Sequence, residues 1–180
     1  RVQRGDEQAF ESLTRADYPR LYLVAKGVLG DPDLAEDATQ QAFVDIWQDI
    51  PRLRDPAKYE GWSYRLLVRV CYAEAKRASD HGDALDAYPV ELSTPDAYTA
   101  VAARDQLQRG LQRLSVDHRV VLVLRHLLGM APEEIAETLG VSRWTVYARS
   151  DRAMKALRAA LEADARSVAI PAPARQESVR

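Results

Sequence analysis

Hydrophobic residues recur along this chain at the three-to-four-residue spacing of amphipathic helices, and strand-like alternation of apolar and polar positions does not occur. Glycine is scarce, at 8 of 180 residues. We expect the first segment to break near Pro19, and Asp33 with Glu36 to cap the second. The pattern predicts an all-α protein with helices over residues 7–29, 34–49, 57–78, 98–114, 120–128, 132–139 and 143–162.

The composition changes at about residue 80, which divides the chain into two helical regions. Residues 80–96 contain five acids, two prolines and no Lys or Arg, a composition typical of a linker. Periodicity resumes at Tyr98, whereas the chain from residue 165 is rich in Ala, Pro and Ser. We therefore predict two small helical domains, 1–79 and 98–164, a flexible acidic linker at 80–97, and a disordered tail at 165–180.

Composition excludes several classes of protein. Cys71 is the single cysteine and the three histidines are scattered, so neither a disulfide, a cysteine-rich zinc site nor any other metal site is expected. No apolar run approaches the ~20 residues that a membrane span needs, and no signal peptide is recognisable. The simplest expectation is a cytoplasmic protein without membrane insertion. The net charge of −2 argues at first against a free-standing nucleic-acid binder.

The sharpest local pattern, at residues 132–152, predicts a helix-turn-helix. Ile135 and Leu139 give a short first helix its apolar face, Gly140 suits a turn with positive φ, and Ser142 suits the N-cap of a second helix. The second helix places five bases and one acid between residues 142 and 158. A helical hairpin with a solvated basic face remains the alternative, and Trp144 fits either an outward position or the edge of the core. The candidate DNA-binding residues are Ser142, Arg143, Trp144, Thr145, Tyr147, Arg149, Arg152 and Lys155.

The near-zero net charge conceals a segregation within the first domain. Residues 31–49 contain six acids and no base, whereas residues 50–79 contain seven bases, three acids and several aromatics. The acidic stretch suits a basic protein surface, and the second combines stacking rings with cations, as single-stranded DNA binding requires. For Trp62, burial in the core and stacking on a base are both open.

Three stretches together resemble bacterial RNA polymerase sigma factors. Leu34-Ala-Glu-Asp-Ala-Thr-Gln-Gln-Ala-Phe43, with Ile46-Trp47 after it, is similar to one signature of that family. Tyr59-Glu-Gly-Trp-Ser-Tyr-Arg65 looks like the stretch that follows it, and residues 111–114, residues 120–124 and the helix-turn-helix look like the family's C-terminal domain. The two-domain layout is similar to the extracytoplasmic-function (ECF) subfamily. The resemblance covers about residues 7–162.

The resemblance implies three binding surfaces and no cofactor. The acidic helix is expected to dock on the β′ clamp helices of core RNA polymerase, which also offers its β subunit; the matching positions are Glu36, Asp37, Gln40, Gln41, Val44 and Asp45. The next helix is expected to capture single-stranded bases of the promoter minus-ten element through Tyr59, Trp62, Arg65, Arg69, Lys76 and Arg77. The helix-turn-helix is expected to read the minus-thirty-five element as duplex. The family also implies regulation by an anti-sigma factor.

Two rival functions compete with this interpretation. A stand-alone transcriptional regulator with one helix-turn-helix would bind a palindromic operator without polymerase. An enzyme is disfavoured, because carboxylates such as Asp33 and Asp37 have no converging partners and no glycine-rich phosphate loop is present. The sequence therefore predicts a promoter-specificity subunit that catalyses no reaction itself.

Overall fold

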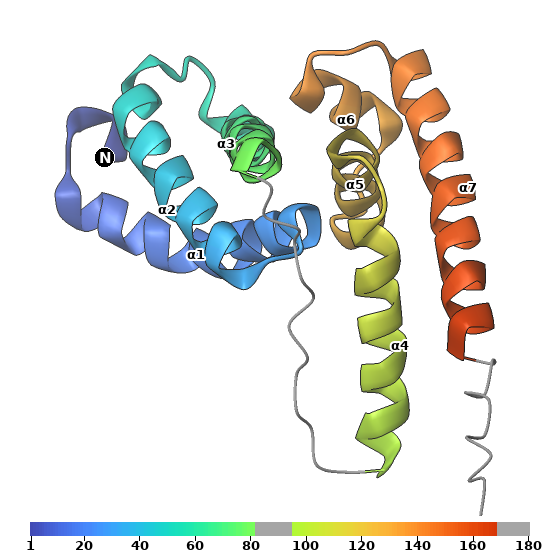
Figure 1. Ribbon diagram of the computed structural model, residues 1–180. Helices are drawn as coiled ribbons and strands as arrows, with labels where there is room; N and C mark the ends of the chain where they lie inside the picture. The colour runs from blue at the N-terminus through green and yellow to red at the C-terminus, as the bar shows by residue number, and fades with distance from the viewer. Residues whose placement is uncertain (82–94, 169–180) are drawn as a thin grey trace, which may run out of the picture.

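The structure is a computed structural model that describes residues 1–81 and 95–168, and every regular element in these ranges is helical. Figure 1 shows two groups of helices that lie side by side. The first group contains η1 (Val2–Arg4), α1 (Glu7–Leu29), α2 (Pro32–Asp49), η2 (Ile50–Arg52), η3 (Pro56–Lys58) and α3 (Tyr59–His81). The second contains α4 (Pro95–Gln112), α5 (Val116–Leu122), the π-helical turn η4 (Val123–Leu127), α6 (Pro132–Leu139) and α7 (Arg143–Val168). The all-α prediction is confirmed.

Helix α1 runs through Pro19 without a break, so the predicted interruption is wrong. A proline inside a helix removes one backbone hydrogen bond and costs roughly 3 kcal/mol. Pro19 lies on the exposed side, where water can solvate the carbonyl group that loses its partner. The turns that follow bury Leu21, Val24 and Val28 completely. The packing of these side chains keeps the helix continuous.

The turn between α1 and α2 is closed by Asp31, not by Asp33 as predicted. Gly30 ends α1 in the left-handed region with φ 77°, and the Asp31 carboxylate accepts hydrogen bonds from the backbone N–H groups of Asp33 (2.8 Å) and Leu34 (2.9 Å). Pro32 occupies the first helical position, where its missing N–H costs nothing. The cap therefore lies two residues earlier, because the proline starts the helix.

Two predicted boundaries shift because the flanking helices are longer than the sequence pattern indicates. Helix α3 continues to His81 and α4 begins at Pro95, so both ends of the predicted linker 80–97 are helical, and the residues between lie outside the described ranges. Helix α7 continues to Val168, so residues 165–168 of the predicted tail are helical, and the rest also lie outside. Asp164 anchors the end of α7 through ion pairs with Arg109 (3.1 Å) and Arg113 (2.5 Å) of α4.

The two groups of helices share one core. The main cluster of buried apolar side chains combines α1, α2 and α3 with Val120 and Val121 of α5, Ile135 of α6 and Val146 of α7. Helix α1 approaches η4 so closely at Gly27 that an added Cβ would lie 2.9 Å from a Val123 methyl group. The sequence predicts two domains joined through a linker, and the structure adds direct packing between the two groups of helices.

Candidate functional site

The turn between α6 and α7 has the local geometry of a helix-turn-helix. Gly140 ends α6 in the left-handed region, at φ 66° and ψ 33°, which a residue with a Cβ adopts only under strain. The Ser142 hydroxyl accepts a hydrogen bond from the Thr145 N–H at 3.1 Å, so Ser142 caps α7. Ile135 and Val146 are fully buried where the two helices meet. The predicted helix-turn-helix is confirmed.

The first two turns of α7 present a mixed aromatic and basic surface to solvent. Trp144 is 71% exposed and Tyr147 is 42% exposed, with their ring centroids 6.2 Å apart. The Arg143 guanidinium lies 5.6 Å from the Trp144 ring and 3.8 Å from the Glu133 carboxylate. Trp144 therefore does not cover the edge of the core. We call the following residues the α7 face: Ser142, Arg143, Trp144, Thr145, Tyr147 and Arg152.

Two other residues predicted to contact duplex DNA have protein partners. Lys155 is exposed and pairs with Asp151 one turn earlier, at 2.8 Å. Arg149 is only 27% exposed, and its guanidinium lies 3.0 Å from the Asp117 carboxylate at the start of α5. The Tyr72 hydroxyl of α3 donates to the same carboxylate at 2.7 Å. Burial, and then the adjacent Asp117, raise the pKa of Tyr72, so its phenol stays protonated and continues to donate.

Along α2, the residues predicted to bind polymerase form one stripe, which is exposed at every position except Asp45, whose side chain is 19% exposed. The opposite side of the helix buries Ala38, Ala42 and Ile46 completely, which fixes the stripe outward. Within it, the Gln41 amide donates to Asp45 at 2.9 Å, and Val44 is an apolar side chain left 47% exposed among polar ones. We call these residues the α2 stripe: Glu36, Asp37, Gln40, Gln41, Val44 and Asp45.

The aromatic side chains at the start of α3 are partly buried because they pack against the main core. Tyr59 and Trp62 are half-buried against the main core, with ring centroids 6.1 Å apart. Burial raises the pKa of Tyr59, so its phenol is neutral. Of the two interpretations of Trp62, burial fits its position better than stacking on a base.

The arginines of α3 are exposed but already paired. The Arg65 guanidinium donates to the carbonyl oxygens of Thr138 (3.1 Å) and Glu137 at the end of α6. Arg69 pairs with Asp45 of the α2 stripe at 3.1 Å, and Arg77 pairs with Glu74 at 2.6 Å. Lys76 is exposed next to Arg77. We call the six predicted minus-ten residues the α3 surface: Tyr59, Trp62, Arg65, Arg69, Lys76 and Arg77.

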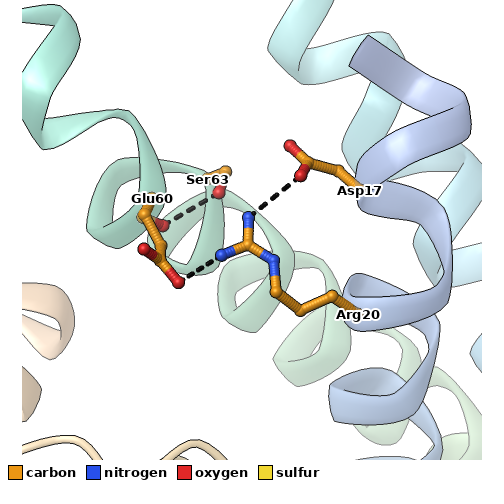
Figure 2. A network of polar contacts seen from close by, with 4 residues as sticks. All are labelled: Asp17, Arg20, Glu60 and Ser63. Atoms are coloured by element: carbon orange, nitrogen blue, oxygen red, sulfur yellow. Dashed lines mark hydrogen bonds and ion pairs between the residues drawn. The ribbon is translucent and has the colours of Figure 1, made fainter. Parts of the chain in front are cut away.

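A network that the sequence analysis missed holds the start of α3 against α1 (Figure 2). Arg20 of α1 pairs with Asp17 at 3.3 Å and with Glu60 of α3, while the Ser63 hydroxyl donates to the Glu60 carbonyl at 2.8 Å. The Arg20 guanidinium also lies 4.8 Å from the centre of the buried Tyr64 ring. The Asp17/Arg20 spacing is visible in the sequence, but nothing there connects it to Glu60, forty residues away.

The described residues offer no site for metal or thiol chemistry. Within residues 1–81 and 95–168, no group of three His, Cys, Asp or Glu side chains converges on a point where an ion would bind. Burial raises the pKa of the Cys71 thiol to about 12, which keeps it protonated and unreactive. None of the helices in these ranges is long and apolar enough to cross a membrane.

Comparison with solved structures shows that the fold is known. RpoE of Bartonella quintana, solved in complex with the anti-sigma factor NepR, aligns with a TM-score of 0.66 over 87% of this chain and 99% of that one, at 21% identity. CnrH, solved in complex with the cytosolic domain of CnrY, also gives a TM-score of 0.66, over 91% and 94% of the two chains, at 24% identity.

Sequence comparison matches a sigma-70 family profile to each half of the chain. The profile of sigma-70 region 2 matches residues 13–81, and that of sigma-70 region 4 matches residues 104–157. The ECF RNA polymerase sigma factor SigM of Mycobacterium tuberculosis is 32% identical over 151 residues, which cover 83% of this chain and 75% of SigM. SigW of Bacillus subtilis, another ECF RNA polymerase sigma factor, is 25% identical over 170 residues, 87% of this chain and 91% of SigW. The chain belongs to the ECF family of RNA polymerase sigma factors, and it is a promoter-specific initiation factor that binds core RNA polymerase.

Proposed function

We propose that the α2 stripe, the α3 surface and the α7 face each bind a different partner during transcription initiation. Residues 1–79 supply the α2 stripe for core polymerase and the α3 surface for the minus-ten element. Residues 98–164 supply the α7 face for the minus-thirty-five element. The observation that carries the proposal is the α7 face, where Trp144 and Tyr147 are exposed beside Arg143 and Arg152 on a capped helix that begins at a helix-turn-helix turn.

The α2 stripe supports docking on a basic protein surface such as the β′ clamp helices. Its carboxylates at Glu36 and Asp37 are exposed, and Val44 adds an apolar contact at the centre of the stripe. Such a combination favours a protein partner over nucleic acid, since phosphates repel carboxylates. The β subunit is the other polymerase surface that we expect the chain to contact.

The α3 surface needs its present contacts to be released before it can bind DNA. Arg65 is held by the end of α6, and Arg149 of α7 is held by Asp117 and Tyr72. The Arg65 contact crosses between the two groups of helices, whereas Arg149 and Asp117 both belong to the second group, and only the Tyr72 hydroxyl reaches Asp117 from the first. Promoter binding through Arg65 therefore requires the groups to separate, at least locally, and binding to polymerase and promoter supplies the free energy for this step.

The chain itself performs no chemical step in this proposal. Base capture and duplex reading are binding events, and contacts to extruded bases offset the few kcal/mol that unstacking costs. Nucleotide addition belongs to the polymerase, and we expect the chain to act in the cytoplasm together with it. We also propose an anti-sigma partner. This proposal is supported by the structural relative RpoE, which was solved in complex with the anti-sigma factor NepR, and by CnrH, which was solved with the cytosolic domain of CnrY.

Run-off transcription with purified core polymerase on a promoter library tests the proposal. We expect a product with the full chain and none above background with core alone. A Trp144→Ala/Arg152→Ala variant should lose most of that product, because both side chains belong to the α7 face. Arg158→Ala is the matched control, since Arg158 is exposed on the same helix beyond that face. Equal loss in both variants, or no product with the wild type, would contradict the proposal.

The stand-alone regulator is tested by a gel shift with and without core polymerase. We expect specific promoter binding only when core is present, since the chain's net charge is −2 and duplex affinity depends on neutralising phosphates. Tight, specific binding by the free chain to a palindromic site would favour the regulator instead.

A further inference from the structure

An apolar groove lies between α1 and the helical elements α4, α5, η4 and α7. Its volume is about 460 Å³, which falls within the range of roughly 300–1,000 Å³ that small-molecule sites occupy. Six leucines form part of its lining: Leu23, Leu107, Leu111, Leu122, Leu127 and Leu157. Leu23, Leu107 and Leu127 remain 43–45% exposed. None of the lining residues belongs to the α2 stripe, the α3 surface or the α7 face, so the groove is an exposed apolar surface that the proposed function does not use.

A buried cation in the lining of the groove has no carboxylate partner. Arg119 is only 5% exposed, and its Nε is buried without a hydrogen-bond partner. Its Nη1 makes one long hydrogen bond of 3.4 Å to the Leu29 carbonyl. Burial lowers the pKa of this guanidinium, and no described carboxylate offsets that effect. Because a buried charge is costly unless it is paired, Arg119 is a candidate binding group for an anion.

The other ionisable side chains that line the groove have the same sign or are neutral. Lys26 of α1 and Arg104 of α4 are cationic, and His126 of η4 is the remaining one, whereas no Asp or Glu of the described part of the chain lines the groove. A surface whose charges are all positive favours an anionic ligand and disfavours a cationic one.

Apart from these cations, the groove offers a ligand few polar contacts. The side-chain amides of Gln108 and Gln112 also line it, but both donate to the Gly30 carbonyl, at 2.9 and 3.4 Å. Arg119 is therefore the buried donor that is left for a ligand, and most of the surface around it is the hydrocarbon of the leucines. Such a site suits a molecule with one small anionic group and a long apolar remainder.

We propose that this groove binds a small amphipathic carboxylate of the fatty-acid type, with its hydrocarbon chain along the leucines and its carboxylate paired with Arg119. A guanidinium presents parallel N–H groups that match the two oxygens of a carboxylate, and the single charges of the two groups compensate each other. The hydrocarbon chain adds affinity through each methylene group that it buries against the leucines.

Isothermal titration of the full chain with ten-carbon ligands tests the proposal without polymerase or promoter. Decanoate has the chain and the carboxylate, decanol has the chain alone, and decyltrimethylammonium carries the opposite charge. We expect decanoate to bind about tenfold or more tightly than decanol, and decyltrimethylammonium not to bind detectably. Acetate, which has the carboxylate without the chain, should not bind detectably either, because it buries almost no apolar surface.

A variant in the lining places the binding in this groove. Leu107→Asp replaces an apolar contact by a negative charge, so we expect it to weaken decanoate binding about tenfold. Ala159→Asp is the matched control, because it introduces the same charge at an exposed position of α7 outside the groove, and it should leave the affinity unchanged.

The role of Arg119 is tested by Arg119→Met, which replaces the guanidinium by an uncharged chain. We expect the variant to fold, since exchanging a buried ionic group for an apolar one is often neutral or stabilising. It should reduce decanoate binding to the level of decanol and leave decanol binding unchanged. A general disturbance of the groove would weaken both ligands alike. If Arg119→Met does not fold, the ligand series and Leu107→Asp still decide the outcome.

Several results would overturn the proposal. Equal binding of decanoate, decanol and decyltrimethylammonium would show a surface that takes up any hydrophobic molecule, and acetate binding as tightly as decanoate would show an anion site that does not use the leucines. No binding of decanoate, or no effect of Leu107→Asp, would remove the groove as the site. If the free chain dimerises and Leu107→Asp abolishes the dimer, the occupant of the groove is a second copy of the chain.

Discussion

The α7 face and the α3 surface are both mixtures of arginine and aromatic residues, yet they differ in what their side chains already contact. On the α7 face, Trp144 and Tyr147 are open to solvent. On the α3 surface, Tyr59 and Trp62 are packed against the core, and Arg65 is bonded to the end of α6. The difference shows that composition alone does not reveal which surface is available. Availability is decided by how the two groups of helices pack.

The largest expected effect comes from breaking the core that joins the two surfaces. Ile135→Ala removes a fully buried side chain between α6 and its neighbours, and such changes cost about 2–5 kcal/mol of unfolding free energy. Because the core is shared, we expect urea unfolding to remain one transition, with amide exchange accelerated in α3 as well as in α7. Leu127→Ala, at a side chain 45% exposed, is the control and should cost much less. Faster exchange in α6 and α7 alone would show that the two groups are independent.

The same substitution at two glycines should act with opposite sign in the two regions. Gly140→Ala places a Cβ at φ 66°, and we expect it to lower the unfolding free energy by about 1–2 kcal/mol. Gly61→Ala lies in helical α3 and its Cβ would be 3.7 Å from the Thr138 hydroxyl, an ordinary contact, so we expect a gain of up to about 1 kcal/mol. Thermal unfolding of both variants measures this. A loss at Gly61 as large as that at Gly140 would mean that α3 and α6 are packed more tightly than described.

A smaller effect is expected from the hydroxyl group that links α3 to α5. Tyr72→Phe removes the 2.7 Å hydrogen bond to Asp117, which we expect to cost about 1 kcal/mol of stability. Tyr147→Phe, on the exposed α7 face, should change stability by less than about 0.5 kcal/mol. Denaturant titration compares the two. Equal effects would indicate that Tyr72 contributes nothing through its hydroxyl.

The smallest effect is a pH dependence of the contact between η3 and α6. Lys58 donates to Glu137 at 3.0 Å and lowers the pKa of that carboxyl group below its ordinary value of 4.5. The contribution of this pair is therefore complete above pH 4.5 and is lost as the pH falls through the lowered pKa of Glu137. Both side chains are 65% exposed, so we expect only slight loosening, detectable as faster amide exchange in α6. Glu137→Gln should remove this pH dependence, and its persistence would assign it to another group.

Features that are contained in one short segment could be predicted from the sequence. The helix-turn-helix follows from Gly140, Ser142 and the apolar spacing around them, because caps and turns are local. The six positions of the α2 stripe came from the resemblance to sigma factors, and the helix leaves five of them exposed to solvent. Pro19 was misjudged because the burial of Leu21 and Val24, which compensates the proline, is a tertiary effect.

Contacts between distant segments could not be predicted from one sequence. Arg149 was expected on the DNA-facing side, but Asp117 and Tyr72 hold it, and its helical position carries no sign of them. Arg65 donates to backbone carbonyl oxygens of α6, and a contact with the backbone cannot be recognised from the pattern of side chains in the sequence. The cavity lined by residues of α1, α4, α5, η4 and α7 forms only when both groups of helices are in place, so no single segment of the sequence indicates it.

The requirement that the two groups of helices separate is tested most directly by crosslinking them covalently and measuring transcription. Lys58→Cys/Glu137→Cys places two thiols at an exposed contact between η3 and α6, where a short, reductively cleavable bismaleimide can join them, while buried Cys71 stays unreactive. We expect the crosslinked chain to give no run-off product above core polymerase alone, and cleavage of the linker to restore the product of the uncrosslinked variant. Full activity of the crosslinked chain would contradict the claim that the α3 surface is withheld until the groups separate.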